Sequence, residues 1–246
     1  MRLKIAILNL IAGCLLIGCN LKTDQTTFSN TDLEDTTTEE STTSKNFKLI
    51  ALGDSYTIGQ SVCETCRFPA QLKDSLQTYY TALDTFNLQI IARTGWTTSN
   101  LKNAIASAEP QTDFDLVTLL IGVNNQYQNK PFSLYETEFI ELITTAISLV
   151  GNDASKLIVV SIPDYAYTPF GQGRNPENIS AQLELYNSYA QTYCKNNDLK
   201  YVNITDITQE GLTNPLLVAS DNLHPSELAY TKFVERILPL ALDILE

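Results

Sequence analysis

The sequence predicts one doubly wound α/β domain, in which helices cover both faces of a parallel sheet. From Phe47 onward, short apolar runs rich in β-formers alternate with amphipathic stretches. Several of these runs are apolar at nearly every position, as expected for parallel strands that are covered on both faces. Strict alternation of strands and helices favours right-handed crossovers that place helices on both sides of the sheet. The 246 residues show no internal repeat and no second folded domain.

Five strands and five longer helices are expected in this domain. The strands are expected at 47–52, 88–92, 116–121, 157–162 and 201–204, and the helices at 69–80, 98–108, 131–150, 176–196 and after Pro225. Two of the helices show apolar residues at intervals of three and four, which gives each one an apolar face. These residues are Phe139, Leu142, Ile143, Ala146, Ile147 and Val150 in one helix, and Phe233, Val234, Ile237, Leu238, Ala241 and Ile244 in the last. Both helices should therefore pack against the sheet.

Residues 1–19 have the features of an export signal. Arg2 and Lys4 precede an apolar run over 5–17 that is shorter than the roughly 20 residues needed to span a bilayer. The segment ends in Gly-Cys, which resembles the lipobox of bacterial lipoproteins, where the cysteine is lipidated and becomes the new N-terminus. The resemblance makes Cys19 the anchor of an exported, membrane-attached protein that faces the periplasm or the cell surface. The alternatives are an ordinary signal peptide or a buried first helix.

Residues 20–46 are dominated by Thr, Ser, Asp and Glu, with Leu21, Phe28 and Leu33 as their only sizeable apolar side chains. Such a composition cannot bury enough apolar surface to offset the entropy of ordering the chain. We therefore expect a flexible tether between the signal peptide and a folded domain at 47–246.

Charge and histidine content exclude two classes of function. The formal net charge of −12 repels phosphate backbones, which nucleic-acid-binding proteins meet with clustered Lys and Arg. The single histidine excludes a metal site with two or more imidazoles and leaves one candidate for a histidine proton shuttle. We expect neither a metal nor an organic cofactor, and no nucleic-acid partner.

Polar and glycine residues follow the expected strands at the sheet edge where ligands bind in such folds. A Gly-Asp-Ser motif ending at Ser55 follows the first strand, Gly95 follows the second and Asn124 follows the third. Asp221 and His224 lie together after the last strand. Four separate loops should thus meet at one edge.

These residue types match the needs of acyl transfer. A serine hydroxyl requires a neighbouring base, and His224 is the only imidazole available to Ser55. Asp221 can orient the imidazole and stabilise its positive charge. The backbone N–H groups of Ser55 and Gly95 and the side-chain amide of Asn124 are candidate donors to the oxyanion. Pro225 suits the first turn of the last helix, which would place His224 near the helix N-terminus.

These segments resemble the SGNH hydrolase superfamily, also called the GDSL family of esterases and lipases. The four letters correspond here to Ser55, Gly95, Asn124 and His224, in the family's order. The resemblance covers the whole expected folded domain. It implies a flavodoxin-like three-layer fold and hydrolysis of an ester, commonly an acyl or acetyl group on a sugar or lipid. Tyr56 stands where many members have leucine, outside the chemical groups.

The expected function is that of an extracytoplasmic serine esterase working through an acyl-enzyme. Each motif alone has a structural alternative, because Gly-Asp-Ser can form a turn and Asp-x-x-His-Pro can cap a helix. Their joint occurrence in this order favours the hydrolase. Two alternatives are an O-acyltransferase that uses the same residues and a surface lipoprotein that binds a glycan without catalysis.

The 163–176 segment is rich in aromatic residues, glycine and proline, and follows the fourth expected strand. Loops in this position often carry binding residues. Its candidates for one wall of a substrate cleft are Tyr165, Tyr167, Phe170 and Arg174. The alternative is a packed surface loop. Trp96, next to Gly95, can either stack on a sugar or acyl chain or belong to the core.

The remaining cysteines have structural interpretations. Cys63 and Cys66 lack the further ligands that a zinc site needs, and in an exported protein they favour a local disulfide over two free thiols. Cys14 leaves with the signal peptide. Cys194 lies in an expected helix and is interpreted as a buried free thiol.

Overall fold

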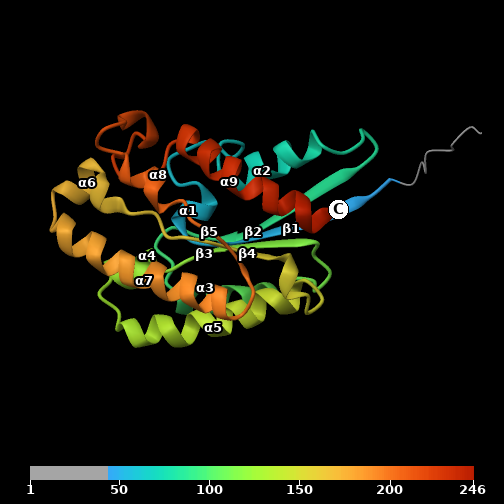
Figure 1. Cartoon of the computed structure of the whole chain (residues 1–246), viewed down its shortest axis with the longest axis horizontal. Helices are drawn as coiled ribbons and strands as arrows, with labels where there is room; N and C mark the ends of the chain where they lie inside the picture. The colour runs from blue at the N-terminus through green and yellow to red at the C-terminus, as the bar shows by residue number, and fades with distance from the viewer. Residues whose placement is uncertain (1–43) are drawn as a thin grey trace, which may run out of the picture. The chain divides into compact units, whose positions relative to one another are not determined.

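The computed structural model describes residues 44–246, which form a five-stranded sheet between two layers of helices (Figure 1). The strand order is β2-β1-β3-β4-β5, and all neighbouring strands are parallel. This order is that of flavodoxin-like folds. The predicted three-layer, doubly wound architecture is confirmed. The export signal expected at 1–19, with Cys19, and most of the tether expected at 20–46 lie outside the described residues.

The strands are β1 (Asn46–Gly53), β2 (Thr85–Ala92), β3 (Leu116–Leu120), β4 (Leu157–Val160) and β5 (Lys200–Val202). The long helices are α2 (Phe68–Gln77), α3 (Thr98–Ala108), α5 (Phe132–Leu149), α7 (Pro176–Asn196) and α9 (Glu227–Leu245). The short helices are α1 (Ser55–Ile58), α4 (Val123–Tyr127), α6 (Pro169–Gln172) and α8 (Thr205–Gln209), and the 3₁₀ turns are η1 (Ala154–Lys156), η2 (Tyr165–Tyr167) and η3 (Pro215–Leu217). In Figure 1, α2 and α9 pack together on one face of the sheet, and α3, α5 and α7 cover the other.

The burial of each strand explains how well its position could be predicted from the sequence. The central strands β3 and β4 are buried at every position, so their apolar runs are continuous. The first six residues of the edge strand β2 alternate between exposed and half-buried, and the strand begins at Thr85, before the expected residue 88. An edge strand lacks one neighbour and therefore keeps polar residues on its open face. The start of β2 pairs with the start of β1 at Asn46.

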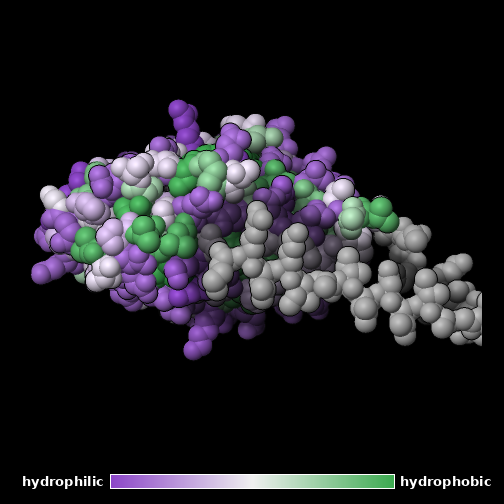
Figure 2. Space-filling model, turned by 90° about the horizontal axis from the view of Figure 1, so that it is seen from above, coloured by the Kyte–Doolittle hydropathy of each residue, from purple (hydrophilic) through white to green (hydrophobic). Residues whose placement is uncertain are grey.

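The two helices with predicted apolar faces pack as expected. In α5, the buried side chains include Phe139, Leu142, Ile143 and Ala146. In α9 they include Phe233. Among residues 44–246, no helix is long and apolar enough to cross a membrane. The part of the surface visible in Figure 2 is mostly hydrophilic, and its apolar residues form small separate groups.

The start of α9 differs from the prediction. The helix begins at Glu227, and the Ser226 side chain accepts a hydrogen bond from the Ala229 N–H as its N-cap. Pro225 precedes this cap and forms a bridge with Val218 instead of occupying the first helical turn. His224 therefore lies outside the first turn of α9. The effect of the helix dipole on His224 is correspondingly weaker.

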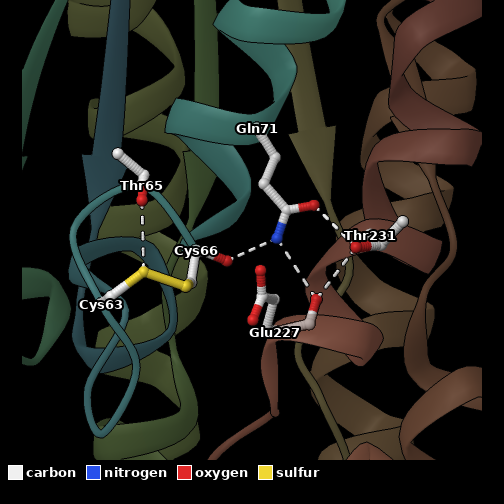
Figure 3. Close-up of a disulfide and its surroundings, with 6 residues drawn as sticks. All are labelled: Cys63, Thr65, Cys66, Gln71, Glu227 and Thr231. Atoms are coloured by element: carbon white, nitrogen blue, oxygen red, sulfur yellow. Dashed lines mark hydrogen bonds between the residues drawn. A yellow bond between two sulfur atoms is a disulfide. The ribbon is translucent and has the colours of Figure 1, made fainter.

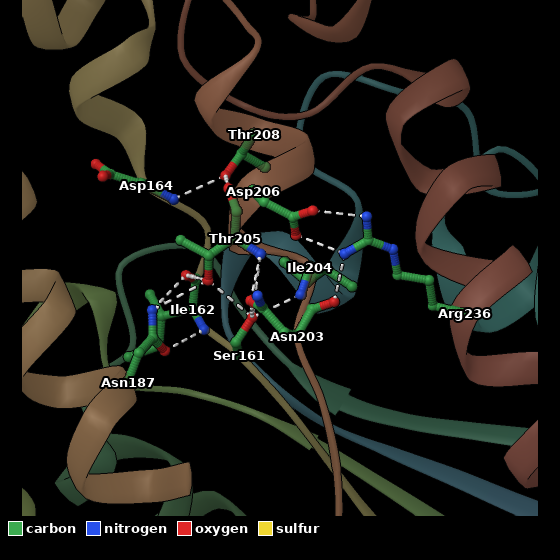
Figure 4. A network of polar contacts seen from close by, with 10 residues as sticks. All are labelled: Ser161, Ile162, Asp164, Asn187, Asn203, Ile204, Thr205, Asp206, Thr208 and Arg236. Carbon is green, nitrogen blue, oxygen red and sulfur yellow. Dashed lines mark hydrogen bonds and ion pairs between the residues drawn. The ribbon is translucent and has the colours of Figure 1, made fainter.

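A polar network fixes the carboxyl ends of β4 and β5 (Figure 4). The Asn187 amide on α7 donates to the Ile162 carbonyl (2.9 Å) and accepts from the Ile162 N–H (2.8 Å). Ser161 Oγ accepts two backbone N–H groups from the connection between β5 and α8. Arg236 of α9 forms an ion pair with Asp206 of α8. The network holds the end of β4, from which η2 and α6 continue.

Candidate active site

The end of β1 places Ser55 at the carboxyl edge of the sheet. A Cβ at Gly53 would lie 2.1 Å from Thr57 Oγ1 and 2.4 Å from the Leu120 carbonyl oxygen, so only glycine fits there. Asp54 caps the next turn, because its Oδ1 accepts the Tyr56 N–H at 3.1 Å. The chain thus turns directly from the strand into α1, whose first residue is Ser55.

Asp221 and His224 form a close carboxylate–imidazole pair in the loop before α9. Asp221 Oδ2 lies 2.6 Å from His224 Nδ1, and Asp221 Oδ1 accepts the backbone N–H groups of His224 (2.9 Å) and Leu223 (3.0 Å). The Ser61 hydroxyl also donates to Asp221 Oδ2, at 2.6 Å. Partial burial raises the pKa of Asp221, but these hydrogen bonds outweigh it and lower the pKa to about 2.

The ionised carboxylate fixes the tautomer of the imidazole. Because a carboxylate without a proton only accepts hydrogen bonds, Nδ1 of His224 must be the donor in this pair. The other ring nitrogen, Nε2, is then free to accept a proton. His224 is 8% exposed and lines the cleft, so its ring reaches the site from a largely buried position.

Tyr56 packs edge-on against the imidazole of His224. The ring centroids lie 5.7 Å apart and the planes meet at 63°. Burial raises the pKa of Tyr56 well above its ordinary value of 10, so the phenol stays neutral and serves as a wall. The sequence showed Tyr56 only as a departure from the family's leucine, and nothing in the sequence indicated this contact.

The loops that carry Gly95 and Asn124 are joined by two hydrogen bonds. The Asn124 side-chain amide donates to the Trp96 carbonyl (3.0 Å), and the Gln128 amide donates to the Gly95 carbonyl (2.9 Å). The Asn124 side chain also lines the cleft. Gly95 has a backbone φ of +85°, a conformation that residues other than glycine rarely adopt.

These groups meet in one cleft of about 310 Å³. Ser55, Gly95, Asn124 and His224 all line it, and Asp221 lies behind His224. The residues that the sequence placed after separate strands are therefore neighbours in space. Within residues 44–246, no three His, Cys, Asp or Glu side chains converge as metal ligands.

Aromatic and aliphatic side chains form the walls of the cleft. Tyr165 and Phe170, both predicted as substrate-binding residues, line it, with ring centroids 6.3 Å apart. Tyr167, Arg174 and Trp96 do not line it. Arg174 instead lies 3.4 Å from the centroid of the Phe170 ring, and Trp96 packs against the core.

The structure adds cleft residues that the sequence analysis missed. They are Tyr56, Thr94, Val123, Tyr127 and Leu223. Tyr127 lies three residues after Asn124 in α4, so the two side chains share one face of that helix. That spacing was the available signal for Tyr127. Tyr56 and Val123 lie in the short helices α1 and α4, and Thr94 and Leu223 lie in loops, so none of the four belongs to a longer periodic pattern.

The two remaining cysteine interpretations agree with the structure. Cys63 and Cys66 form a disulfide in the loop between α1 and α2. Cys194 is a free, fully buried thiol, and burial raises its pKa to about 12.

Asp54 is a buried carboxyl that the sequence analysis did not single out. It is fully buried, and its Oδ2 has no hydrogen-bond partner among the described residues. Burial raises the pKa of Asp54 from 3.8 to about 7, although the hydrogen bond from the Tyr56 N–H acts in the opposite direction. The carboxyl directly before Ser55 therefore releases its proton only near neutral pH.

No curated protein sequence matches the chain significantly. The chain is similar in structure to a member of the lipolytic G-D-S-L family from Veillonella parvula, with a TM-score of 0.58, 15% identity, and coverage of 78% of this chain and 97% of that chain. It is also similar to an acetylxylan esterase from Geobacillus stearothermophilus (TM-score 0.61, 19% identity, 80% and 95% covered). A psychrotrophic esterase from Pseudoalteromonas sp. is a third (TM-score 0.55, 16% identity, 80% and 98% covered).

At these identities the structural likeness shows a shared fold, and the sequence supplies the family. Residues 51–232, most of the chain, match the model of the GDSL-like lipase/acylhydrolase family. The matched range includes the Gly-Asp-Ser turn, the loops of Gly95 and Asn124, and the Asp221–His224 pair. The chain therefore belongs to the GDSL-like lipase/acylhydrolase family of ester-hydrolysing enzymes.

Proposed function

We propose that the protein is an extracytoplasmic serine esterase that uses Ser55, His224 and Asp221 as a catalytic triad. The observation that carries the proposal is the 2.6 Å contact between Asp221 Oδ2 and His224 Nδ1 behind a cleft that Ser55 and His224 line together. A base oriented by a carboxylate, in one cleft with a serine hydroxyl, is the arrangement that activates a serine nucleophile.

In the proposed mechanism, Ser55 Oγ attacks the ester carbonyl carbon while His224 Nε2 takes the hydroxyl proton. The negative charge that develops on the carbonyl oxygen is stabilised by the N–H groups of Ser55 and Gly95 and the amide of Asn124. When the tetrahedral intermediate collapses, the C–O bond to the alcohol breaks and His224 returns the proton to the leaving oxygen. Water then attacks the acyl-enzyme by the same route and releases the acid.

The proposed substrate is a carboxylic ester with an acyl or acetyl group on a carbohydrate or lipid. The walls formed by Tyr127, Tyr165 and Phe170 support a substrate that presents an apolar surface or a ring face to the cleft. The proposed mechanism uses no metal or organic cofactor, because His224 carries out each proton transfer.

The site is tested by hydrolysis of p-nitrophenyl acetate and longer p-nitrophenyl esters by the mature protein. Ser55→Ala and His224→Ala are each expected to lower kcat by about 10³-fold or more, because nucleophile and base act as a unit. Ser107→Ala is the matched control, since Ser107 is exposed and bonds only within α3. Activity that is unchanged in both site variants would contradict the proposed triad.

The same assay separates hydrolysis from acyl transfer. When a sugar is added as an acceptor, an esterase releases the free acid, whereas an O-acyltransferase delivers the acyl group to a hydroxyl of the sugar. Binding of a glycan with no release of acid or acyl product from any ester would instead support a non-catalytic surface lipoprotein.

We also propose that the protein is exported and attached to a membrane through a lipid on Cys19. This part of the proposal rests on the sequence of residues 1–19. Cell fractionation and labelling with a radioactive fatty acid test it: the intact protein is expected in the membrane fraction and to carry the label, and Cys19→Ser is expected to carry none. A Cys19→Ser protein that is still labelled would contradict the anchor.

A further inference from the structure

Ser61 contacts the proposed triad from a distant part of the chain. It lies in the loop between α1 and α2, 160 residues before Asp221. Its hydroxyl donates to Asp221 Oδ2 at 2.6 Å, and the same oxygen faces His224 Nδ1. In the part of the chain that the structure describes, Ser61 and His224 are the two residues whose side chains bond to this carboxylate.

The backbone at Ser61 adopts a conformation that disfavours most residues. Its φ is +69°, in the left-handed region that glycine occupies without steric conflict. The Val62 N–H bonds to the Gly59 carbonyl (3.2 Å) and closes the turn that contains Ser61. Strained residues of this kind persist where the surrounding structure holds them, often at functional sites.

The loop around this serine is braced on its far side (Figure 3). The Cys63–Cys66 disulfide closes a four-residue ring directly after it. The Gln71 amide donates to the Cys66 carbonyl (2.5 Å) and to the Glu227 carbonyl at the first residue of α9 (3.2 Å). Its oxygen accepts the Thr231 hydroxyl (2.8 Å). The loop is thus tied to the start of the helix that follows the Asp-x-x-His segment.

We propose that Ser61 is a positioning residue that holds the Asp221 carboxylate in the orientation that His224 requires. The proposal rests on the proposed esterase function. The Asp221 side chain is 29% exposed, so water competes for its oxygens and the carboxylate needs a fixed partner. A charge-assisted hydrogen bond from a braced loop supplies that partner. Ser61 acts on the reaction only through Asp221.

Kinetics of single and double variants test this role. Ser61→Ala is expected to lower kcat about tenfold with little change in KM, as for the loss of one hydrogen bond to a charged group. In an Asp221→Ala background the same change is expected to cost nothing further, because its partner is already absent. Equal losses in both backgrounds would show a general effect on the loop and overturn the proposal.

Two further variants separate the hydroxyl from the backbone conformation. Ser61→Gly removes the hydroxyl and relieves the positive φ, so it is expected to lose as much kcat as Ser61→Ala. Ser61→Asn tolerates this φ and carries a donor, so it is expected to recover part of the activity. Full activity in Ser61→Gly would overturn the proposal.

A measurement without substrate keeps the two proposals distinguishable. The chain has one histidine, so the ring signals of His224 in an NMR spectrum need no further assignment. The Nδ1 proton shared with Asp221 is expected to shift in Ser61→Ala and to stay unchanged in the control Ser107→Ala. An unchanged signal in Ser61→Ala overturns the role of Ser61. A shifted signal in a protein that hydrolyses no ester supports the contact and counts against the esterase.

Discussion

Replacing Asp54 by asparagine is expected to change how the stability of the protein depends on pH, in a direction that favours the variant increasingly as the pH rises. Burial raises the pKa of Asp54 to about 7, from an ordinary value of 3.8. Well below pH 3.8 the carboxyl is protonated in both the folded and unfolded states. As the pH rises from about 3 to 7, the unfolded chain releases this proton and the folded protein keeps it, so the free energy of unfolding falls.

The size of this effect follows from the two pKa values. Each pKa unit corresponds to about 1.36 kcal/mol, so the difference between 3.8 and about 7 gives roughly 4 kcal/mol between pH 4 and pH 8. Asp54→Asn keeps an oxygen that can accept the Tyr56 N–H and removes the ionisation. Its stability relative to the natural protein should therefore rise by roughly 4 kcal/mol over that range. Any cost of burying the amide adds a constant that does not vary with pH.

Urea unfolding at several pH values measures this difference, and the single tryptophan, Trp96, reports the transition by fluorescence. Asp153→Asn is the matched control. Hydrogen bonds from the Ser155 side chain and N–H lower the pKa of the exposed Asp153 below its ordinary value of 3.8, so that variant should lose relative stability only in the acid range and show almost no further change between pH 5 and pH 8. A stability difference for Asp54→Asn that stays constant from pH 4 to pH 8 would refute the reasoning, because Asp54 would then ionise equally in both states.

Three further outcomes are expected. Gly122→Ala should destabilise the protein and lower kcat/KM, because the alanine Cβ would lie 2.7 Å from Ile162 Cδ1 and from a Tyr135 ring carbon, and the backbone φ here is +131°. Thermal melting and ester hydrolysis check this, and an unchanged Tm would contradict it. Serine at both Cys63 and Cys66 should lower the free energy of unfolding by about 2 kcal/mol through the lost ring closure, as measured in urea; equal stability of both forms would count against it. Tyr127→Ala should raise KM for longer-chain p-nitrophenyl esters about tenfold with little change in kcat, whereas an equal KM would remove Tyr127 from the binding wall.

The fold was predictable because its signals are local and periodic. Continuous apolar runs identified β3 and β4, and three- and four-residue spacing identified the buried faces of α5 and α9. Where the environment breaks the pattern, the prediction was less complete. The edge strand β2 begins earlier than expected because its open side tolerates polar residues, and a serine cap moves the start of α9 past Pro225.

The sequence by itself determined which reactive groups the protein has and on which edge of the sheet they lie. Ser55, Gly95 and Asn124 each lie within a few residues of the end of a strand, and parallel strands bring their carboxyl ends together. His224 reaches the same edge only after α8 and η3, which follow β5.

Only the tertiary structure decided what surrounds these groups. It brings Ser61 into contact with Asp221, 160 residues away in the sequence, and packs Tyr56 against His224. It also places Tyr127 in the cleft and packs the partly buried Trp96 against the core. Such contacts depend on how loops of irregular conformation pack against one another. Periodicity and motif spacing predict the helices and strands, because these have a regular backbone. Contacts between two distant loops depend on the packing of the whole domain.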